Sequence, residues 1–165
     1  MNLLPVHSET LVSILSKEEV LGHLIRVTRE VNFMDARTQR DPQIRFNGMV
    51  GQKGFRISRV IKRGDSFLPL ITGQVESTAR GSIIFLNYRL FSATVFFWVF
   101  WSIVLLAFSA FYFFAQQNIS YGCICLALAV GNYALSLFLF QRQVKLSRQV
   151  FHELINLEGP VGRFQ

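Results

Sequence analysis

An uncharged run from Leu90 to Gln141 constrains this fold more than any other feature, because it contains no Lys, Arg, Asp, Glu or His. A bilayer core about 30 Å thick needs about 20 apolar residues for each helical crossing. The run is long enough for two crossings, and Gln116, Gln117 and Asn118 interrupt it near the middle. The sequence therefore predicts a transmembrane hairpin over residues 90–141, with helices at 91–115 and 120–141.

The basic residues predict the orientation of this hairpin. Thirteen Lys and Arg residues precede it and four follow it, whereas the connection Gln116–Tyr121 has none. Loops that carry Lys and Arg stay in the cytoplasm. The N-terminus lacks the basic residues and the long apolar run of a secretory signal. We expect a multi-pass protein of the cell inner (cytoplasmic) membrane with both termini cytoplasmic.

The net charge of +7 raises the question of nucleic acid as a partner. Basic residues beside membrane spans are expected from topology alone, and no separate basic patch with stacking aromatic residues accompanies them. We therefore expect membrane lipid, and not nucleic acid, as the partner of this charge. The candidate contacts to acidic head groups are Lys62, Arg63, Arg80, Arg89 and Arg142.

Residues 1–89 have the pattern of a small cytoplasmic α+β domain. Ser16 and Glu19 form a capping box, which predicts a helix from Lys17 to about Val31 with one apolar stripe. Residues 9–15 before it alternate between polar and apolar, which fits a short strand, with a first helical turn as the alternative. Residues 33–42 are polar and are predicted to form a loop.

Beyond that loop, the apolar residues recur at every second position, which is typical of strands. Turn residues separate the runs, so we expect an antiparallel meander with the 17–31 helix on one face. Pro69 cannot donate a hydrogen bond to a neighbouring strand, which places its strand at an edge or at a bulge. The four predicted strands are residues 44–50, 55–61, 67–75 and 82–89.

Residues 142–165 are predicted to form a cytoplasmic helix with one apolar side, ending near Gly159 and Pro160. Glu153 and Glu158 favour docking on the first domain, because a helix on the membrane surface usually has a basic polar face. Lying on the membrane remains the alternative. The predicted class is α+β: a β-meander with one or two covering helices, plus the transmembrane hairpin.

Small residues recur every four positions in the second predicted span, at Cys123, Ala127 and Gly131. Such a stripe lets helix backbones approach closely. The first span of the same chain is the expected neighbour, and self-association of two chains is the alternative. Asn132 is expected to form a hydrogen bond between helices.

A resemblance follows from the turn and strand residues of the domain. They fit the patterns F-x-G at Phe46, F-x-I-x-R from Phe55 to Arg59, and S-F-x-P-x-I-x-G from Ser66 to Gly73, followed by Gly81. This arrangement resembles a family of small uncharacterised bacterial membrane proteins. The resemblance implies the architecture and no activity, and it singles out Arg59 and Ser66 as candidate contacts to a ligand or partner.

No catalytic motif, metal-ligand spacing or cofactor motif accompanies this architecture, and the three histidines are scattered. We therefore expect no enzyme, no metal and no cofactor. The first hypothesis is a non-enzymatic membrane protein whose domain mediates protein interaction or assembly, with its own copies or with an unidentified partner protein. The alternatives are a lipid or small-ligand sensor, with a cavity between the 17–31 helix and the sheet that Arg59 reaches, and an oligomerising effector or pore.

Overall fold

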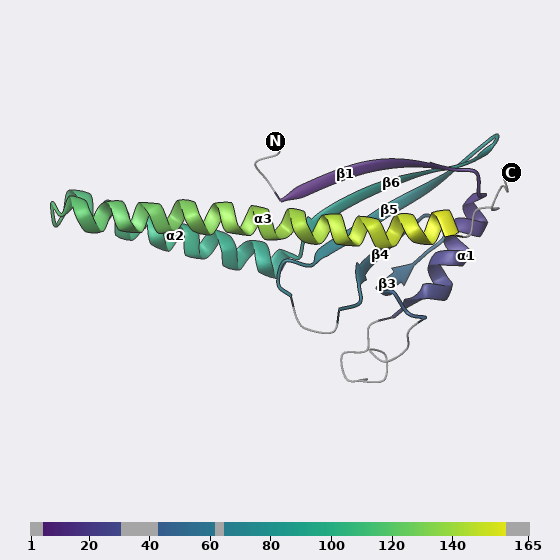
Figure 1. Cartoon of the computed structure of the whole chain (residues 1–165), viewed down its shortest axis with the longest axis horizontal. Coiled ribbons are helices and arrows are strands. Elements are labelled where there is room, and N and C mark those ends of the chain that lie inside the picture. The colour runs from purple at the N-terminus through teal and green to yellow at the C-terminus, as the bar shows by residue number, and fades with distance from the viewer. Residues whose placement is uncertain (1–4, 31–42, 62–64, 158–165) are drawn as a thin grey trace, which may run out of the picture.

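The computed structural model describes residues 5–30, 43–61 and 65–157, and it has an α+β architecture (Figure 1). A mixed sheet of six strands is joined to a pair of long apolar helices. The strands are β1 (Val6–Ser13), β2 (Thr28–Arg29), β3 (Phe46–Val50), β4 (Gly54–Arg59), β5 (Pro69–Thr78) and β6 (Gly81–Leu90). The helices are α1 (Lys17–Val27), α2 (Ser92–Phe114) and α3 (Ile119–Leu157).

The sheet is larger than the predicted meander. Strands β3 to β6 are the four predicted strands, and the full order is β1-β6-β5-β4-β3-β2. Strand β1 pairs antiparallel with β6 over its whole length, from Val6 opposite Arg89 to Ser13 opposite Ser82. Two-residue β2 pairs in parallel with β3 at the other edge. The short strand that the alternation of residues 9–15 predicted is present as β1, whereas two-residue β2 was not predicted, because so short a strand shows no alternation in the sequence.

The edge position predicted for the strand of Pro69 is wrong, since β5 lies between β6 and β4. Pro69 is the first residue of that strand. A proline is tolerated at the first position of a strand as well as at an edge. The central strand therefore accommodates it without losing pairing further along.

Helix α1 begins as its capping box predicts. Ser16 Oγ accepts from the Glu19 N–H at 3.3 Å, and the Glu19 carboxylate accepts from the Ser16 N–H at 2.7 Å. These contacts lower the pKa of Glu19, the bond from the Ser16 backbone most of all. The helix ends at Val27, earlier than predicted, because Thr28 already pairs with β3. Val31 and the predicted loop at 33–42 lie outside the described residues.

Helix α3 does not stop at Gln141, where the second predicted span ends. It runs unbroken for 39 residues, which corresponds to about 58 Å, and its last turns lie on the sheet (Figure 1). Phe151 of α3 is fully buried, and its ring stacks on Phe55 at 5.7 Å and meets Phe46 edge-on at 6.3 Å. One continuous helix therefore links the apolar hairpin to the core of the α+β part.

Helices α1 and α3 both pack on the same face of the sheet. The buried cluster joins Val20 and Leu24 of α1 and Phe140, Val144, Phe151 and Leu154 of α3 to inward side chains of β3 to β6. Side chains on the opposite face are mostly exposed, and no described element covers that face. We call it the open face of the sheet.

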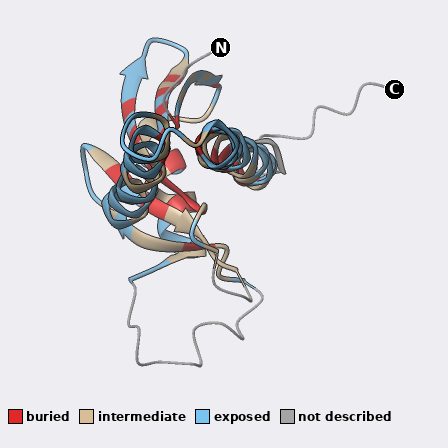
Figure 2. Cartoon of the chain, turned by 90° about the vertical axis from the view of Figure 1, so that its left-hand side faces the viewer, coloured by how far each residue is buried: buried red, intermediate tan, exposed pale blue. Residues whose placement is uncertain are grey.

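Helix α2 and residues 119–141 of α3 form an antiparallel pair, which we call the apolar hairpin. Both helices are long and apolar enough to cross a membrane, and only 6% and 17% of their most apolar windows are buried. Viewed along the hairpin, Figure 2 shows helices that are largely exposed and buried segments on the strands. The hairpin therefore presents apolar side chains outward on nearly all sides.

Candidate functional site

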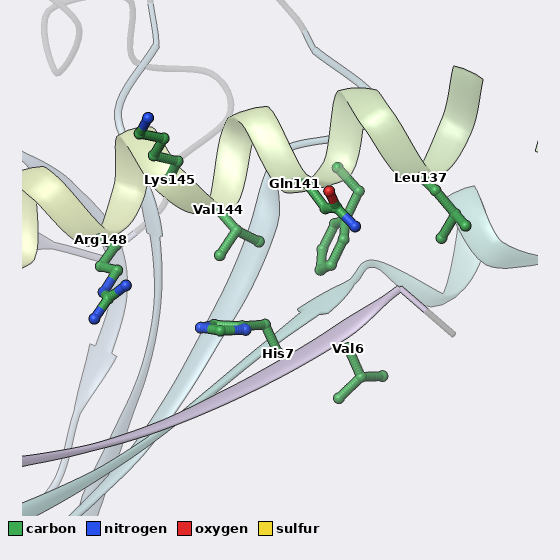
Figure 3. Close-up of a pocket in the computed structure, with 8 residues that line it drawn as sticks. Val6, His7, Leu137, Gln141, Val144, Lys145 and Arg148 are labelled. Atoms are coloured by element: carbon green, nitrogen blue, oxygen red, sulfur yellow. The ribbon is translucent and has the colours of Figure 1, made fainter. Parts of the chain in front are cut away.

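A pocket of about 400 Å³ lies between the beginning of β1 and the middle of α3, at the end of the sheet next to the hairpin (Figure 3). Side chains from one side of α3 line it because they are spaced three or four residues apart, which places them on one helix face. We call it the β1–α3 pocket. Its lining residues are Val6 and His7 of β1, and Leu137, Phe140, Gln141, Val144, Lys145 and Arg148 of α3.

The lining of this pocket changes from apolar to basic along α3. Leu137 and Phe140 lie at the hairpin end, and Lys145 and Arg148 lie at the other. Figure 3 shows the Arg148 guanidinium and the His7 ring on the β1 side of α3, whereas the Lys145 amine points away from β1. A cavity of this size is within the range of ligand pockets, and such a lining suits a molecule with an apolar and an anionic part.

Glu9 connects β1 to α3 beside this pocket. Its Oε1 lies 2.7 Å from NH2 of Arg148 and 2.9 Å from Nε2 of His152, and it also accepts from Arg148 Nε at 2.9 Å. The Glu9 side chain is only 8% exposed, whereas that of Arg148 is 48% exposed. Because the Glu9 carboxylate is nearly buried, loss of its basic partners would leave a buried charge unpaired, so these contacts hold β1 against α3.

Tyr88 of β6 lies behind His7, with ring centroids 5.8 Å apart. Its hydroxyl and Oε2 of Glu9 are buried and have no hydrogen-bond partner within the described part of the chain. Burial raises the pKa of Tyr88 well above its ordinary value, and the charge of Glu9 raises it further. The inner wall of the site is therefore polar, largely desolvated and not fully paired.

Arg59, a predicted site residue, lies outside the β1–α3 pocket. Its NH2 donates to Oε1 of Gln143 at 2.8 Å, and the Gln143 amide donates to Asp65. Asp65 in turn accepts from the Phe67 N–H at 2.9 Å. Arg59 thus reaches an acidic side chain through a glutamine of α3, and this chain of contacts connects β4 to that helix.

Ser66, the other residue that the resemblance singles out, is exposed and makes its contact through the backbone. Its carbonyl accepts from the Thr94 hydroxyl at 2.9 Å, in the first turn of α2. Arg59 and Ser66 therefore both lie at the junction between sheet and hairpin, and their described contacts are to the protein itself.

The predicted head-group contacts are divided between two ends of the molecule. Arg89 and Arg142 are exposed near the hairpin, at the end of β6 and on α3. Arg80 lies in the turn before Gly81, and the length of β6 puts this turn about 30 Å from Leu90. Arg80 is therefore at the end of the sheet away from the hairpin. Lys62 and Arg63 lie outside the described residues.

The small-residue stripe was expected to face α2, but its residues lie on another side of α3. Cys123, Ala127 and Gly131 are exposed, and a side chain at Gly131 would meet no atom within 4 Å. The buried positions on this part of α3 are instead Gly122, Ala129, Ser136 and Phe140. The helices are joined by hydrogen bonds from Ser109 Oγ to the Gly122 carbonyl at 3.0 Å and from Asn132 Nδ2 to Ser102 Oγ at 3.2 Å.

Four residues at or beside the β1–α3 pocket were not predicted from the sequence to be site residues: His7, Glu9, Arg148 and His152. Two weak signals were present, since His7 and Glu9 share one face of a strand, and Arg148 and His152 are four residues apart on a helix. Neither signal reveals that the strand and the helix are neighbours. Among the described residues, no group of three or more His, Cys, Asp or Glu side chains is placed to hold a metal ion.

Comparison of the chain with protein-family models, with curated proteins and with solved structures gave no match. The resemblance to small bacterial membrane proteins therefore stays a prediction, and the function has to be argued from the site.

Proposed function

We propose that the apolar hairpin anchors this protein in the inner membrane, with the α+β part in the cytoplasm. Two observations support this proposal: the hairpin side chains are exposed and apolar, and Arg89, Arg142 and Lys145 gather where the hairpin meets the sheet. Basic residues at this position are those that the positive-inside rule places in the cytoplasm. The connection between α2 and α3 then faces the other side.

On this anchor, the cytoplasmic part binds an amphiphilic ligand in the β1–α3 pocket. The observation that carries the proposal is the lining of the pocket, which runs from Leu137 to Arg148 along one face of α3. Those eleven residue steps span about 16 Å of helix, from the uncharged run to the basic residues beyond it. An amphiphile from the inner leaflet has its apolar and charged parts in the same order.

The proposed function corresponds to the predicted lipid or small-ligand sensor, but its cavity lies elsewhere in the molecule. That hypothesis put the cavity between the 17–31 helix and the sheet, within reach of Arg59. Val20 and Leu24 of α1 instead belong to the packed core, and Arg59 is bonded to Gln143. The pocket lies under α3, nearer to the bilayer.

Photocrosslinking tests the proposal. The full-length protein is placed in lipid nanodiscs that contain a trace of a phospholipid with a photoreactive acyl chain, and the labelled peptides are mapped. We expect labelling of β1 and of residues 137–148, and we expect Val144→Trp to reduce it by filling the pocket. The matched control Val12→Trp lies on the open face, where the side chain is 82% exposed.

Two results would contradict ligand binding in the pocket. One is labelling spread evenly over the whole hairpin, as expected for bulk lipid. The other is equal labelling of Val144→Trp and Val12→Trp when both variants melt at the same temperature as the parent protein.

Assembly of two copies through the open face is a second candidate function. Val12, Ile83 and Phe85 share this face by register, and Phe85 is 41% exposed. The strands run along the direction of the hairpin (Figure 1), so a two-fold axis along the membrane normal brings two open faces together with both hairpins in one bilayer. Subunit counting by single-molecule photobleaching tests this: Phe85→Glu is expected to convert dimers to monomers, and a monomeric parent protein would refute it.

A further inference from the structure

From the contacts of Arg148 we infer that the head of the proposed ligand is a phosphate bound by this side chain, and that Glu9 limits its affinity by competing for the same guanidinium. The inference rests on the proposed function of the β1–α3 pocket. It adds the chemical class of the ligand and names a residue of the protein that opposes binding.

Arg148 has donors left for a ligand. A guanidinium carries five N–H groups. The bonds to Glu9 use Nε and NH2, so NH1 and the second hydrogen of NH2 have no described protein partner. The side chain is about half exposed and lines the pocket, whereas Glu9 lies behind it and is nearly buried. Arg148 is therefore placed between its internal carboxylate and the open pocket.

The surroundings of Arg148 favour an anion with several oxygens. No carboxylate is among the residues that line the pocket, and Lys145, three residues away on the same helix, adds positive charge although its amine points away from β1. The planar fork of Arg matches the geometry of a phosphate, and paired charged hydrogen bonds are stronger than neutral ones. The apolar wall at Leu137 and Phe140 accommodates the beginning of an acyl chain. The class that fits is a phosphate-headed lipid of the inner leaflet.

Glu9 opposes the binding of such a ligand, whereas Arg148 promotes it. Its carboxylate accepts two hydrogen bonds from Arg148, and its negative charge repels an incoming phosphate. Glu9→Gln keeps the shape and one oxygen acceptor but removes the charge. If Glu9 competes for Arg148, this variant binds the anion more tightly. If Glu9 only holds β1 in place, the variant binds less tightly, because the pocket loosens.

Titration of the full-length protein in phosphatidylcholine nanodiscs tests the inference. The probes are lysophosphatidic acid, lysophosphatidylcholine, oleate and inorganic phosphate, with affinity measured by isothermal titration calorimetry. For lysophosphatidic acid we expect Glu9→Gln to bind about 3- to 5-fold more tightly and Arg148→Gln on the order of tenfold more weakly. The charge control Arg56→Gln, which is exposed on β4 and outside the pocket lining, is expected to bind as the parent protein does.

The possible results distinguish a failure of this inference from a failure of the proposed function. Unchanged or weaker binding by Glu9→Gln, with its melting temperature preserved, overturns competition by Glu9. Equal affinity for oleate or for lysophosphatidylcholine overturns the choice of an anionic phosphate head, and equal affinity for inorganic phosphate overturns its source in a lipid. Saturable binding of none of the four probes overturns the proposed function itself.

Discussion

Replacing Phe151 with alanine tests whether α3 is anchored on the sheet, and the β1–α3 pocket depends on this anchoring. Phe151 is 0% exposed, and its ring contacts Phe55 and Phe46 from two neighbouring strands. Removal of the ring leaves a cavity between helix and sheet near the end of α3, ten residues beyond the uncharged run. The last turns of α3 then lose their largest apolar contact.

The expected loss in the free energy of unfolding follows from the burial of the Phe151 ring. Truncating a fully buried Phe to Ala costs about 3–5 kcal/mol, which includes the lost transfer energy and the cavity. Domains of this kind are stable by about 5–15 kcal/mol, so the change removes a large share of the stability. The matched control on the same helix is Leu146→Ala, because Leu146 is 37% exposed. We expect it to cost about 1 kcal/mol or less, as is usual for substitutions at exposed positions.

Urea unfolding in mild detergent, followed by circular dichroism, measures the free energy of unfolding of both variants. Hydrogen exchange then locates the effect, since Phe151→Ala is expected to raise exchange in residues 143–157 and to leave that of residues 119–135 unchanged. A cost below about 1 kcal/mol for Phe151→Ala would refute the docking of α3, because a fully buried ring cannot be removed so cheaply.

The remaining predictions concern the capping box, the buried tyrosine and the junction. Ser16→Ala is expected to cost about 1 kcal/mol in thermal or urea unfolding, since α1 loses its N-cap acceptor. The lowered pKa of Glu19 adds stability that is complete above its ordinary value of 4.5 and is lost as the pH falls through the lowered value. Ser16→Ala removes part of this contribution, so we expect it to lose less stability in acid than the parent protein does. The raised pKa of Tyr88 makes stability fall as the pH rises, which is the opposite pH dependence. Its contribution is complete below the ordinary value of 10.0 and is lost as the pH rises towards the raised one, so Tyr88→Phe is expected to flatten the decline in melting temperature above pH 10.0. Gln143→Leu is expected to destabilise the junction by about 1–3 kcal/mol, because it leaves the Arg59 guanidinium without its described partner, whereas Gln149→Leu, at an exposed position of α3, is expected to be neutral in the same unfolding assay.

Local patterns in the sequence were sufficient for the elements of the α+β part. The capping box gave the start of α1, and the alternation of apolar residues gave β3 to β6 within a few residues. Pro69 misled the prediction, because proline is compatible with a central strand when it is the first residue. Arg59 was singled out as a candidate contact to a ligand or partner, but its described partner is Gln143 of the same chain, 84 residues away in the sequence.

The candidate site was not predictable in the same way. Glu9 and Arg148 are 139 residues apart, and only the pairing of β1 with β6 and the docking of α3 bring them together. The helix after Gln141, by contrast, was predicted from its apolar side, and Val144, Phe151 and Leu154 of that side pack into the core of the sheet.

The sequence by itself determined which segments are helical, which are extended and which third of the chain is uncharged and apolar. These properties depend on backbone hydrogen bonding and on the transfer of side chains between solvents, which act over a few neighbouring residues. Tertiary structure alone decided that β1 lies against α3 and that a pocket opens between them. Contacts between distant segments form only if the burial they achieve exceeds the entropy lost in ordering the chain, and that balance belongs to the whole fold.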